Sequence, residues 1–258
     1  MNAIRMLAVG VLLGTAATGL GAREDTEKAL TAPTWEIGPE VSYFRYEEPG
    51  TMKDTGVLYG VTGAYTHSRY SRLFRIEGAF SFGLVDYEGA LDDGTPYTMH
   101  GNHDYLLNLR LLWGQEWGAA GWDNRFTVGF GYRGLNDDSS QDPHGYDRQS
   151  NYLYLPVGLK ACHELANHWQ IGLGGELDIL LIGIQFSGIY EDSVLTNVQW
   201  PGFGARASVE LRHKGRPIDL ALAPFIQYWW VDDSSVSDGW YEPRNHSFQY
   251  GLGLIWRF

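Results

Sequence analysis

The chain has 258 residues, a formal net charge of -12 and a mean hydropathy of -0.27. This negative balance excludes nucleic acid as a partner, because phosphates must be neutralised by Lys and Arg. The single cysteine, Cys162, excludes an intramolecular disulfide and a cysteine-based metal site. Aromatic residues make up 14% of the chain, and its 33 glycines are also abundant. This composition is typical of a β-barrel with aromatic girdles.

The N-terminus has the features of an export signal. Arg5 precedes a short apolar stretch at 6–20, and the small residues Gly21 and Ala22 follow it. This stretch is too short for a membrane-spanning helix. We therefore expect a signal peptide over residues 1–22, a periplasmic lead-in over 23–34 and a barrel over 35–258.

Apolar and polar residues alternate with a period of two through the rest of the chain, which predicts β-strands. In the stretch 73–87, for example, Phe74 and Ile76 alternate with Arg75 and Glu77. A transmembrane strand needs about 9–11 residues, whereas strands of soluble proteins average about 5–6. The alternation predicts ten strands, although eight or twelve remain possible: about 35–46, 57–66, 73–87, 103–113, 125–133, 151–162, 169–187, 200–212, 218–231 and 246–258.

Alternation alone does not tell which face of the sheet is turned inward. A soluble barrel would bury its apolar face, whereas a membrane barrel turns that face towards lipid. The export signal, the strand lengths and the terminal Phe258 favour the second arrangement. The predicted fold class is therefore all-β, a transmembrane antiparallel up-and-down barrel of about ten strands.

The connections are expected to be long outside and short inside. With both termini in the periplasm, the outer loops are 47–56, 88–102, 134–150, 188–199 and 232–245. They contain sixteen acidic and three basic residues. One hypothesis is that divalent cations bridge these loops to lipopolysaccharide phosphates, since Ca²⁺ favours oxygen ligands. The alternative is that the carboxylates are simply solvated.

The inward faces of the predicted strands are rich in charge. A barrel of about eight strands is filled by side chains, and buried charges must be paired, so we expect a salt-bridged, largely filled lumen. A narrow selective pore and a catalytic site in the lumen are the alternatives. The charges expected to line the lumen are Glu40, Arg75, Glu77, Arg110, Arg125, Glu176, Asp178, Arg206, Glu210 and Arg257.

Candidates for chemistry are few. His100, His103 and Asp104 have a spacing that could bind a transition metal, although such spacing is common by chance. Nucleophile, zinc-protease, phosphate-loop and dinucleotide motifs are all missing. No cofactor and no catalytic residue is therefore expected, and an enzyme is the less favoured class.

The last residues, FQYGLGLIWRF, resemble the final strand of Gram-negative outer-membrane barrels. That resemblance implies an integral outer-membrane protein whose final strand is read by the barrel-assembly machinery and whose neighbours are lipid and lipopolysaccharide. The stretch 132–159 looks like a segment found in uncharacterised barrel proteins.

Ten-stranded omptin proteases offer a further comparison. Their pattern has an Asp pair on one outer loop and a His/Asp pair on an opposing loop. Asp92 and Asp93 match the first pair, but the loop GIYEDSVLTNVQ has no histidine. The favoured function is consequently a structural or surface-interaction barrel. A narrow pore and a barrel enzyme, protease-like or lipid-modifying, are the alternatives.

Overall fold

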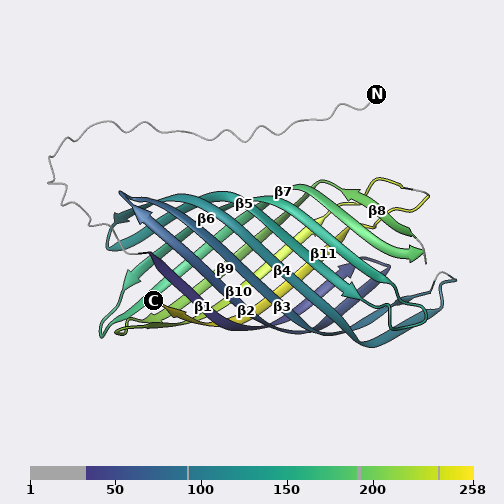
Figure 1. The fold of residues 1–258 in the computed structure, drawn as a ribbon, viewed down its shortest axis with the longest axis horizontal. Helices are drawn as coiled ribbons and strands as arrows, with labels where there is room; N and C mark the ends of the chain where they lie inside the picture. Colours follow the sequence, from purple (N-terminus) through teal and green to yellow (C-terminus); the bar gives the residue numbers. More distant parts are fainter. Residues whose placement is uncertain (1–32, 92, 191–192, 238) are drawn as a thin grey trace, which may run out of the picture.

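Residues that alternate with a period of two form the wall of a closed antiparallel barrel (Figure 1). The computed structural model describes residues 33–91, 93–190, 193–237 and 239–258. The strands are β1 (Thr34–Glu48), β2 (Met52–Arg69), β3 (Arg72–Ala90), β4 (Pro96–Ala119), β5 (Trp122–Asp138), β6 (Asp147–Glu164), β7 (Trp169–Tyr190), β8 (Ser193–Gln199), β9 (Gly202–His213), β10 (Asp219–Val231) and β11 (Asn245–Arg257).

Ten strands complete the barrel, which confirms the predicted fold class. Each strand pairs with its neighbour in sequence, and β1 pairs with β11 to close the sheet. Strand β7 pairs with β8 at its outer part and with β9 over the remainder. Trp200 and Pro201 interrupt what is otherwise one wall strand formed by β8 and β9. No helix in the described part of the chain is long and apolar enough to cross a membrane.

Both ends of the described chain lie at the same end of the barrel, here called the terminal end. Trp35 and Phe258 exchange two backbone hydrogen bonds of 2.9 and 3.2 Å there. Tight turns join the strands at this end. Tyr70 and Ser71 form one of them and both have positive φ, as two-residue hairpins of this kind require.

At the opposite end of the barrel, here called the outer end, the loops are shorter than predicted. Strands β4 and β7 contain 24 and 22 residues, at least twice the roughly 9–11 residues that span a bilayer. The segments predicted as outer loops at 47–56, 88–102 and 134–150 are therefore largely strand, and 188–199 contains β8. These predictions were wrong because a strand that projects beyond the bilayer needs no apolar outer face, while its backbone ladder continues. Only the segment 232–244 is mostly without strand.

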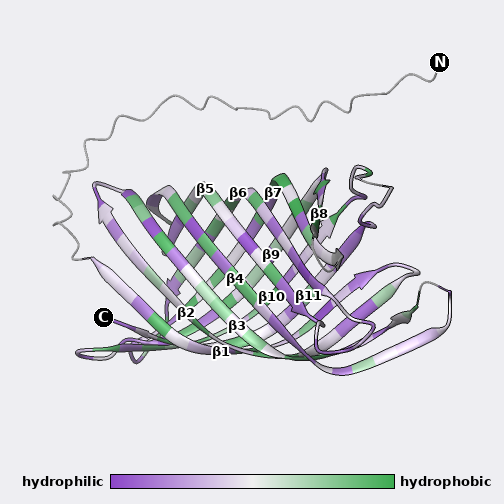
Figure 2. Cartoon of the chain, turned by 45° about the vertical axis from the view of Figure 1, so that its right-hand side comes forward, coloured by the Kyte–Doolittle hydropathy of each residue, from purple (hydrophilic) through white to green (hydrophobic). Residues whose placement is uncertain are grey.

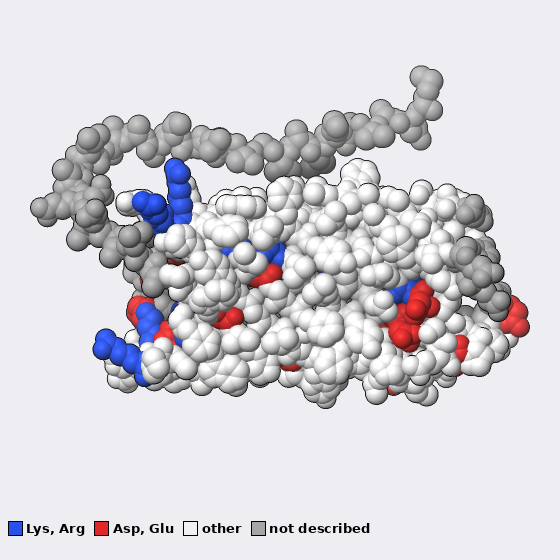
Figure 3. Space-filling model, in the orientation of Figure 1, with Lys and Arg blue, Asp and Glu red and all other residues white. Residues whose placement is uncertain are grey.

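A band of apolar side chains is exposed on the outside of the wall. Hydrophobic and hydrophilic residues alternate along its strands (Figure 2). Aromatic contacts occur at the two borders of the band, with Trp35 and Tyr65 at the terminal end and Phe203 and Trp230 at the outer end. The face seen in Figure 3 is largely uncharged between its ends. Outward apolar side chains include Val41, Tyr59, Phe82, Leu109, Phe130, Leu153, Leu177, Leu222 and Leu252. This is the inverted arrangement predicted for a barrel in lipid.

The expected boundaries of the signal peptide, the lead-in and the barrel stay predictions. The predicted signal peptide and most of the lead-in lie outside the described residues, as does Asp92.

Candidate functional site in the lumen

A chain of ion pairs lines the terminal half of the lumen. Glu36 of β1 contacts Arg75 at 2.6 Å and also pairs with Arg257. The chain of alternating signs continues in the order Arg257, Glu36, Arg75, Glu77, Arg110 and Glu176. Each carboxylate interior to this chain is held between two guanidinium groups, which compensates its burial.

Two shorter groups complete this charged layer. Lys160 donates to Glu210 at 2.6 Å, and Arg212 also pairs with Glu210. Arg125 contacts Glu116 at 2.7 Å. The paired residues come from strands at most three positions apart around the wall. These contacts therefore follow the wall and leave the middle of the lumen open.

A cavity of about 200 Å³ occupies this space. Five acidic and five basic side chains line it, so its formal charge is balanced. The side chains of Arg257, Arg125 and Lys160 are 21–29% exposed and form its terminal rim. The cavity is polar and large enough to hold water. The terminal half of the lumen is thus a hydrated pocket that meets solvent at the terminal end.

The outer half has one central cation. Arg148 on β6 contacts Glu48 at 2.6 Å, Asp137 at 3.0 Å and Asp54 at 3.4 Å. All four side chains are only 2–9% exposed. Glu48 lies on β1, five strands away from β6 in the ten-stranded wall. Arg148 consequently reaches across the lumen to the opposite side.

A second arginine crosses the lumen nearer the middle. Arg133 on β5 donates to Ser247 on β11, which is also five strands away, at 3.4 Å. Its guanidinium lies 5.9 Å from the ring centroid of Trp229, a cation–π arrangement. Trp229 in turn packs against Tyr152 and Tyr154, with ring centroids 5.7 and 5.0 Å away. This aromatic layer lies between the hydrated pocket and the Arg148 group.

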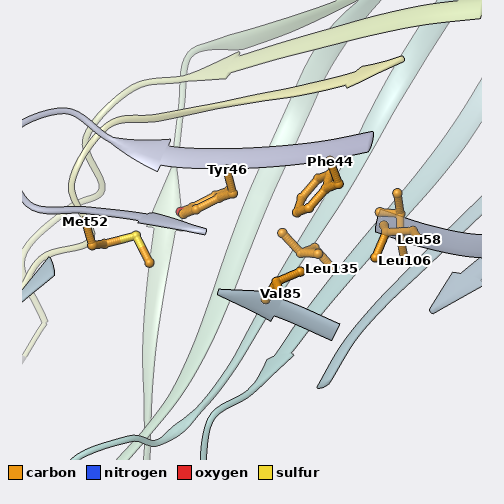
Figure 4. Close-up of a cluster of buried hydrophobic side chains, with 7 residues drawn as sticks. All are labelled: Phe44, Tyr46, Met52, Leu58, Val85, Leu106 and Leu135. Atoms are coloured by element: carbon orange, nitrogen blue, oxygen red, sulfur yellow. The ribbon is translucent and has the colours of Figure 1, made fainter. Parts of the chain in front are cut away.

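Glycine makes room for these rings. A Cβ atom at Gly204 would lie 2.6 Å from the Trp229 ring, and one at Gly131 would lie 2.1 Å from Tyr154. Only glycine allows so close an approach of ring and backbone. The opposite wall contributes a second apolar cluster to the interior (Figure 4): Phe44, Tyr46, Met52, Leu58, Val85, Leu106 and Leu135.

Glu242, in the segment between β10 and β11, covers the Arg148 group from the outer side. Gln185 donates to its carboxyl group at 3.0 Å, and Arg148 lies 4.0 Å away. Burial, reinforced by the nearby charge of Glu48, raises the pKa of Glu242 to about 8. Glu242 therefore carries a proton over much of the neutral range, which reduces the excess of negative charge at this site.

The structure places the ten predicted lumen charges on inner faces. Eight of them line the hydrated pocket: Glu40, Arg75, Glu77, Arg110, Arg125, Glu176, Arg206 and Glu210. Arg257 joins the ion-pair chain at the rim. Asp178 is fully buried, and neither of its carboxylate oxygens has a hydrogen-bond partner among the described residues.

The predicted metal ligands are not brought together. His103 is exposed on the outer face of β4, whereas Asp104 is buried on its inner face. Consecutive strand residues point to opposite sides of a sheet, so these two cannot share an ion. His100 lies 3.1 Å from Asp86 instead. In the described ranges no three His, Cys, Asp or Glu side chains are grouped closely enough for a metal, and this candidate site was wrong.

Of the acidic pair compared with omptins, only Asp93 lies within the described residues. Asp93 accepts a hydrogen bond from the backbone N–H of Thr95 at 2.9 Å and so stabilises its own turn. His144 packs edge-on against Tyr97, with ring centroids 5.4 Å apart. Neither contact is typical of an activated water site.

Sequence reasoning missed the residues that close the outer half. Arg148 and Glu48 fall in segments interpreted as solvated loops, so their meeting across the lumen was not expected. Trp229 lies between two outward residues of β10, Tyr228 and Trp230, and the run of three aromatics hides the alternation. One signal was available in the sequence. Trp229 is two residues from the polar Gln227, so the two side chains lie on the same face of the strand, which predicts that Trp229 points inward.

No family model matches the chain, and no curated protein sequence matches it either. Among solved structures, the toluene transporter TodX of Pseudomonas putida is 11% identical, with 88% of this chain and 89% of that chain covered and a TM-score of 0.36. The attachment invasion locus protein Ail of Yersinia pestis is 12% identical over 88% of this chain and 99% of its own, with a TM-score of 0.37. The translocator domain of the autotransporter NalP of Neisseria meningitidis is 11% identical over 91% of each chain, with a TM-score of 0.39.

Proposed function

We propose that this protein spans the bacterial outer membrane as a barrel with a closed lumen, and that it acts through its two exposed ends. The apolar band supports insertion in lipid, since so large an apolar surface is unfavourable in water. The short terminal turns would face the periplasm, and the longer outer strands would stand above the membrane.

The observation that carries the closed lumen is the pair of arginines that cross it. Arg148 contacts the wall opposite to its own strand, and so does Arg133. Between them the aromatic layer around Trp229 fills the remaining space. An ion would have to displace buried and paired side chains in order to pass, which costs several kcal/mol per charge.

Single-channel recording of the refolded protein in planar bilayers tests this proposal. We expect no steady conductance at moderate voltage and neutral pH. A steady, ohmic conductance of the unmodified chain would show that the lumen conducts, and the proposal would then be withdrawn.

A narrow pore is the second candidate. It is favoured by the hydrated pocket, whose five acidic and five basic side chains provide a polar path along half of the lumen. Such a pore would have to open by movement of Trp229 and Arg133. Conductance steps that appear only at high voltage or altered pH would support this candidate over a permanently closed barrel.

We further propose that the outer end meets lipopolysaccharide through divalent cations. Its exposed carboxylates include those of Asp86, Glu88, Asp93, Asp147 and Asp233, and oxygen ligands of this kind suit Ca²⁺. Thermal unfolding in lipopolysaccharide-containing membranes should occur at a higher temperature with Ca²⁺ than with a chelator. Equal unfolding temperatures would remove this proposal.

The final strand is the proposed contact for the barrel-assembly machinery. The side chain of Phe258 is 54% exposed, and its backbone closes the sheet against Trp35. Phe258→Ala should slow assembly in cells while the purified chain still refolds in detergent. Unchanged assembly in cells would argue against this role.

A further inference from the structure

Two charged side chains of the hydrated pocket differ from all the others. Of the ten charged residues that line the pocket, eight take part in ion pairs within the described chain. Glu40 and Arg206 line the same pocket, and among the described residues neither has an ion pair or a side-chain hydrogen bond. Each therefore presents an unneutralised charge to the pocket interior.

Their positions prevent them from neutralising each other directly. Glu40 lies on β1 and Arg206 on β9, three strands apart around the wall. They interact through space, because the charge of Arg206 acts on Glu40, but they are more than 4 Å apart. The pocket lies between them, and the guanidinium of Arg206 also lies 5.2 Å from the ring centroid of Phe225.

We propose that this pocket binds a small zwitterion, a molecule that carries an ammonium group and a carboxylate a few bonds apart. The carboxylate would pair with Arg206, which offers a planar set of N–H donors suited to such an anion. The ammonium group would pair with Glu40. A solute with both charges satisfies both walls at once, whereas a simple anion or cation leaves one of them unpaired.

The pocket is suited to this ligand class in size and in access. Its volume of about 200 Å³ is suited to a small solute such as an amino acid. Its rim at the terminal end is partly exposed, while the aromatic layer closes the other side. The ligand would therefore enter from the terminal end. The inference goes beyond the closed-barrel function and does not depend on it.

Calorimetric titration of the refolded protein in detergent at low salt tests the proposal. The probes are ω-amino acids of increasing length, from glycine to 6-aminohexanoate, with acetate and methylammonium as singly charged comparisons. We expect saturable binding with an optimum chain length, and binding at that length about tenfold or more tighter than for either single ion. The absence of binding for every amino acid, or equally tight binding of acetate, would overturn the proposal.

Variants identify the side chains that bind the probe. Glu40→Gln and Arg206→Gln should each weaken binding of the best amino acid by about tenfold. Glu242→Gln, at the outer end, is the matched control and should leave binding unchanged. The double variant E40R/R206E exchanges the two charges and should restore part of the affinity, because the ligand can bind in the reverse direction.

Folding of each variant is checked by its heat-modifiable migration on gels. Binding that persists in a folded Glu40→Gln or Arg206→Gln protein would overturn the assignment. Should a variant fail to fold, the comparison of amino acids with acetate on the unmodified chain still decides the proposal. A negative result here leaves the conductance experiment unaffected, since no membrane is needed.

Discussion

The two halves of the lumen pair their buried charges in different ways. In the terminal half, ion pairs join strands that are at most three positions apart, and the centre stays hydrated. In the outer half, Arg148 and Arg133 each reach a strand five positions away. Pairs of the first kind follow the wall, whereas pairs of the second kind cross the lumen.

Charge balance differs between the halves as well. The hydrated pocket has equal numbers of acidic and basic side chains. The outer half gathers Glu48, Asp54, Asp137 and Glu242 around one cation, Arg148, with which all four are paired. A balanced and hydrated layer tolerates the loss of one member, because water replaces it. A dry layer with one cation depends on that cation, and the following experiments test this difference.

The largest effect is expected from Arg148→Met. The substitution leaves at least three buried carboxylates without a counter-ion, so unfolding should become easier by about 4 kcal/mol. Urea-induced unfolding in detergent micelles measures this. Arg125→Met removes a partly exposed cation of the hydrated half and should cost at most about 1 kcal/mol. Equal losses for the two variants would contradict the comparison.

Trp229→Ala should have the next largest effect. The side chain is 1% exposed and fills the layer between the two halves, so its removal should cost about 3 kcal/mol. It should also join the hydrated pocket to the outer half and produce measurable conductance. Trp200→Ala, on an exposed aromatic residue, is the control. A closed lumen in the Trp229→Ala protein would show that Arg148 and Arg133 suffice as a barrier.

Glu242 gives the outer half a dependence on pH. Burial holds the pKa of its carboxyl at about 8 in the folded protein, above its ordinary value of 4.5. A raised pKa stabilises the fold fully below about pH 4.5, and this contribution is lost as pH rises through 8. The free energy of unfolding should therefore fall between pH 5 and pH 9 because of this group.

Glu242→Gln isolates that contribution, because the amide does not titrate and can still accept a hydrogen bond from Gln185. The difference in unfolding free energy between the two proteins should change with pH over this window. A constant difference from pH 5 to pH 9 would mean that Glu242 does not carry its proton into the neutral range.

The sequence predicted the wall well and the outer half of the interior poorly. Alternation in 73–87 predicted the strand and its two faces, and the export signal, the strand lengths and Phe258 then favoured the apolar face as the outward one. The pairing of Arg148 with Glu48 joins residues 100 positions apart, and both lay in polar segments without a lipid-facing pattern. Contacts across the lumen depend on which strands face each other. This arrangement follows from the total number of strands, which no local sequence pattern contains.

The smallest effect, and the only gain, is expected from Asp178→Asn. Asp178 opposes Gly204 in the sheet, and Gly204 opposes Trp229, so this carboxylate lies at the boundary of the two halves. It is fully buried, and both of its oxygens lack a hydrogen-bond partner in the described chain. An amide costs less than a carboxylate to bury, so unfolding should become harder by about 1 kcal/mol.

Glu176→Gln provides the matched comparison to Asp178→Asn. Glu176 lies two residues away on the same inner face of β7, but it is paired with Arg110. Neutralising it should therefore destabilise the fold. Loss of stability in both variants would mean that Asp178 acts as a counter-ion to the surrounding arginines, and that the charged layer extends one step further outwards than the ion pairs indicate.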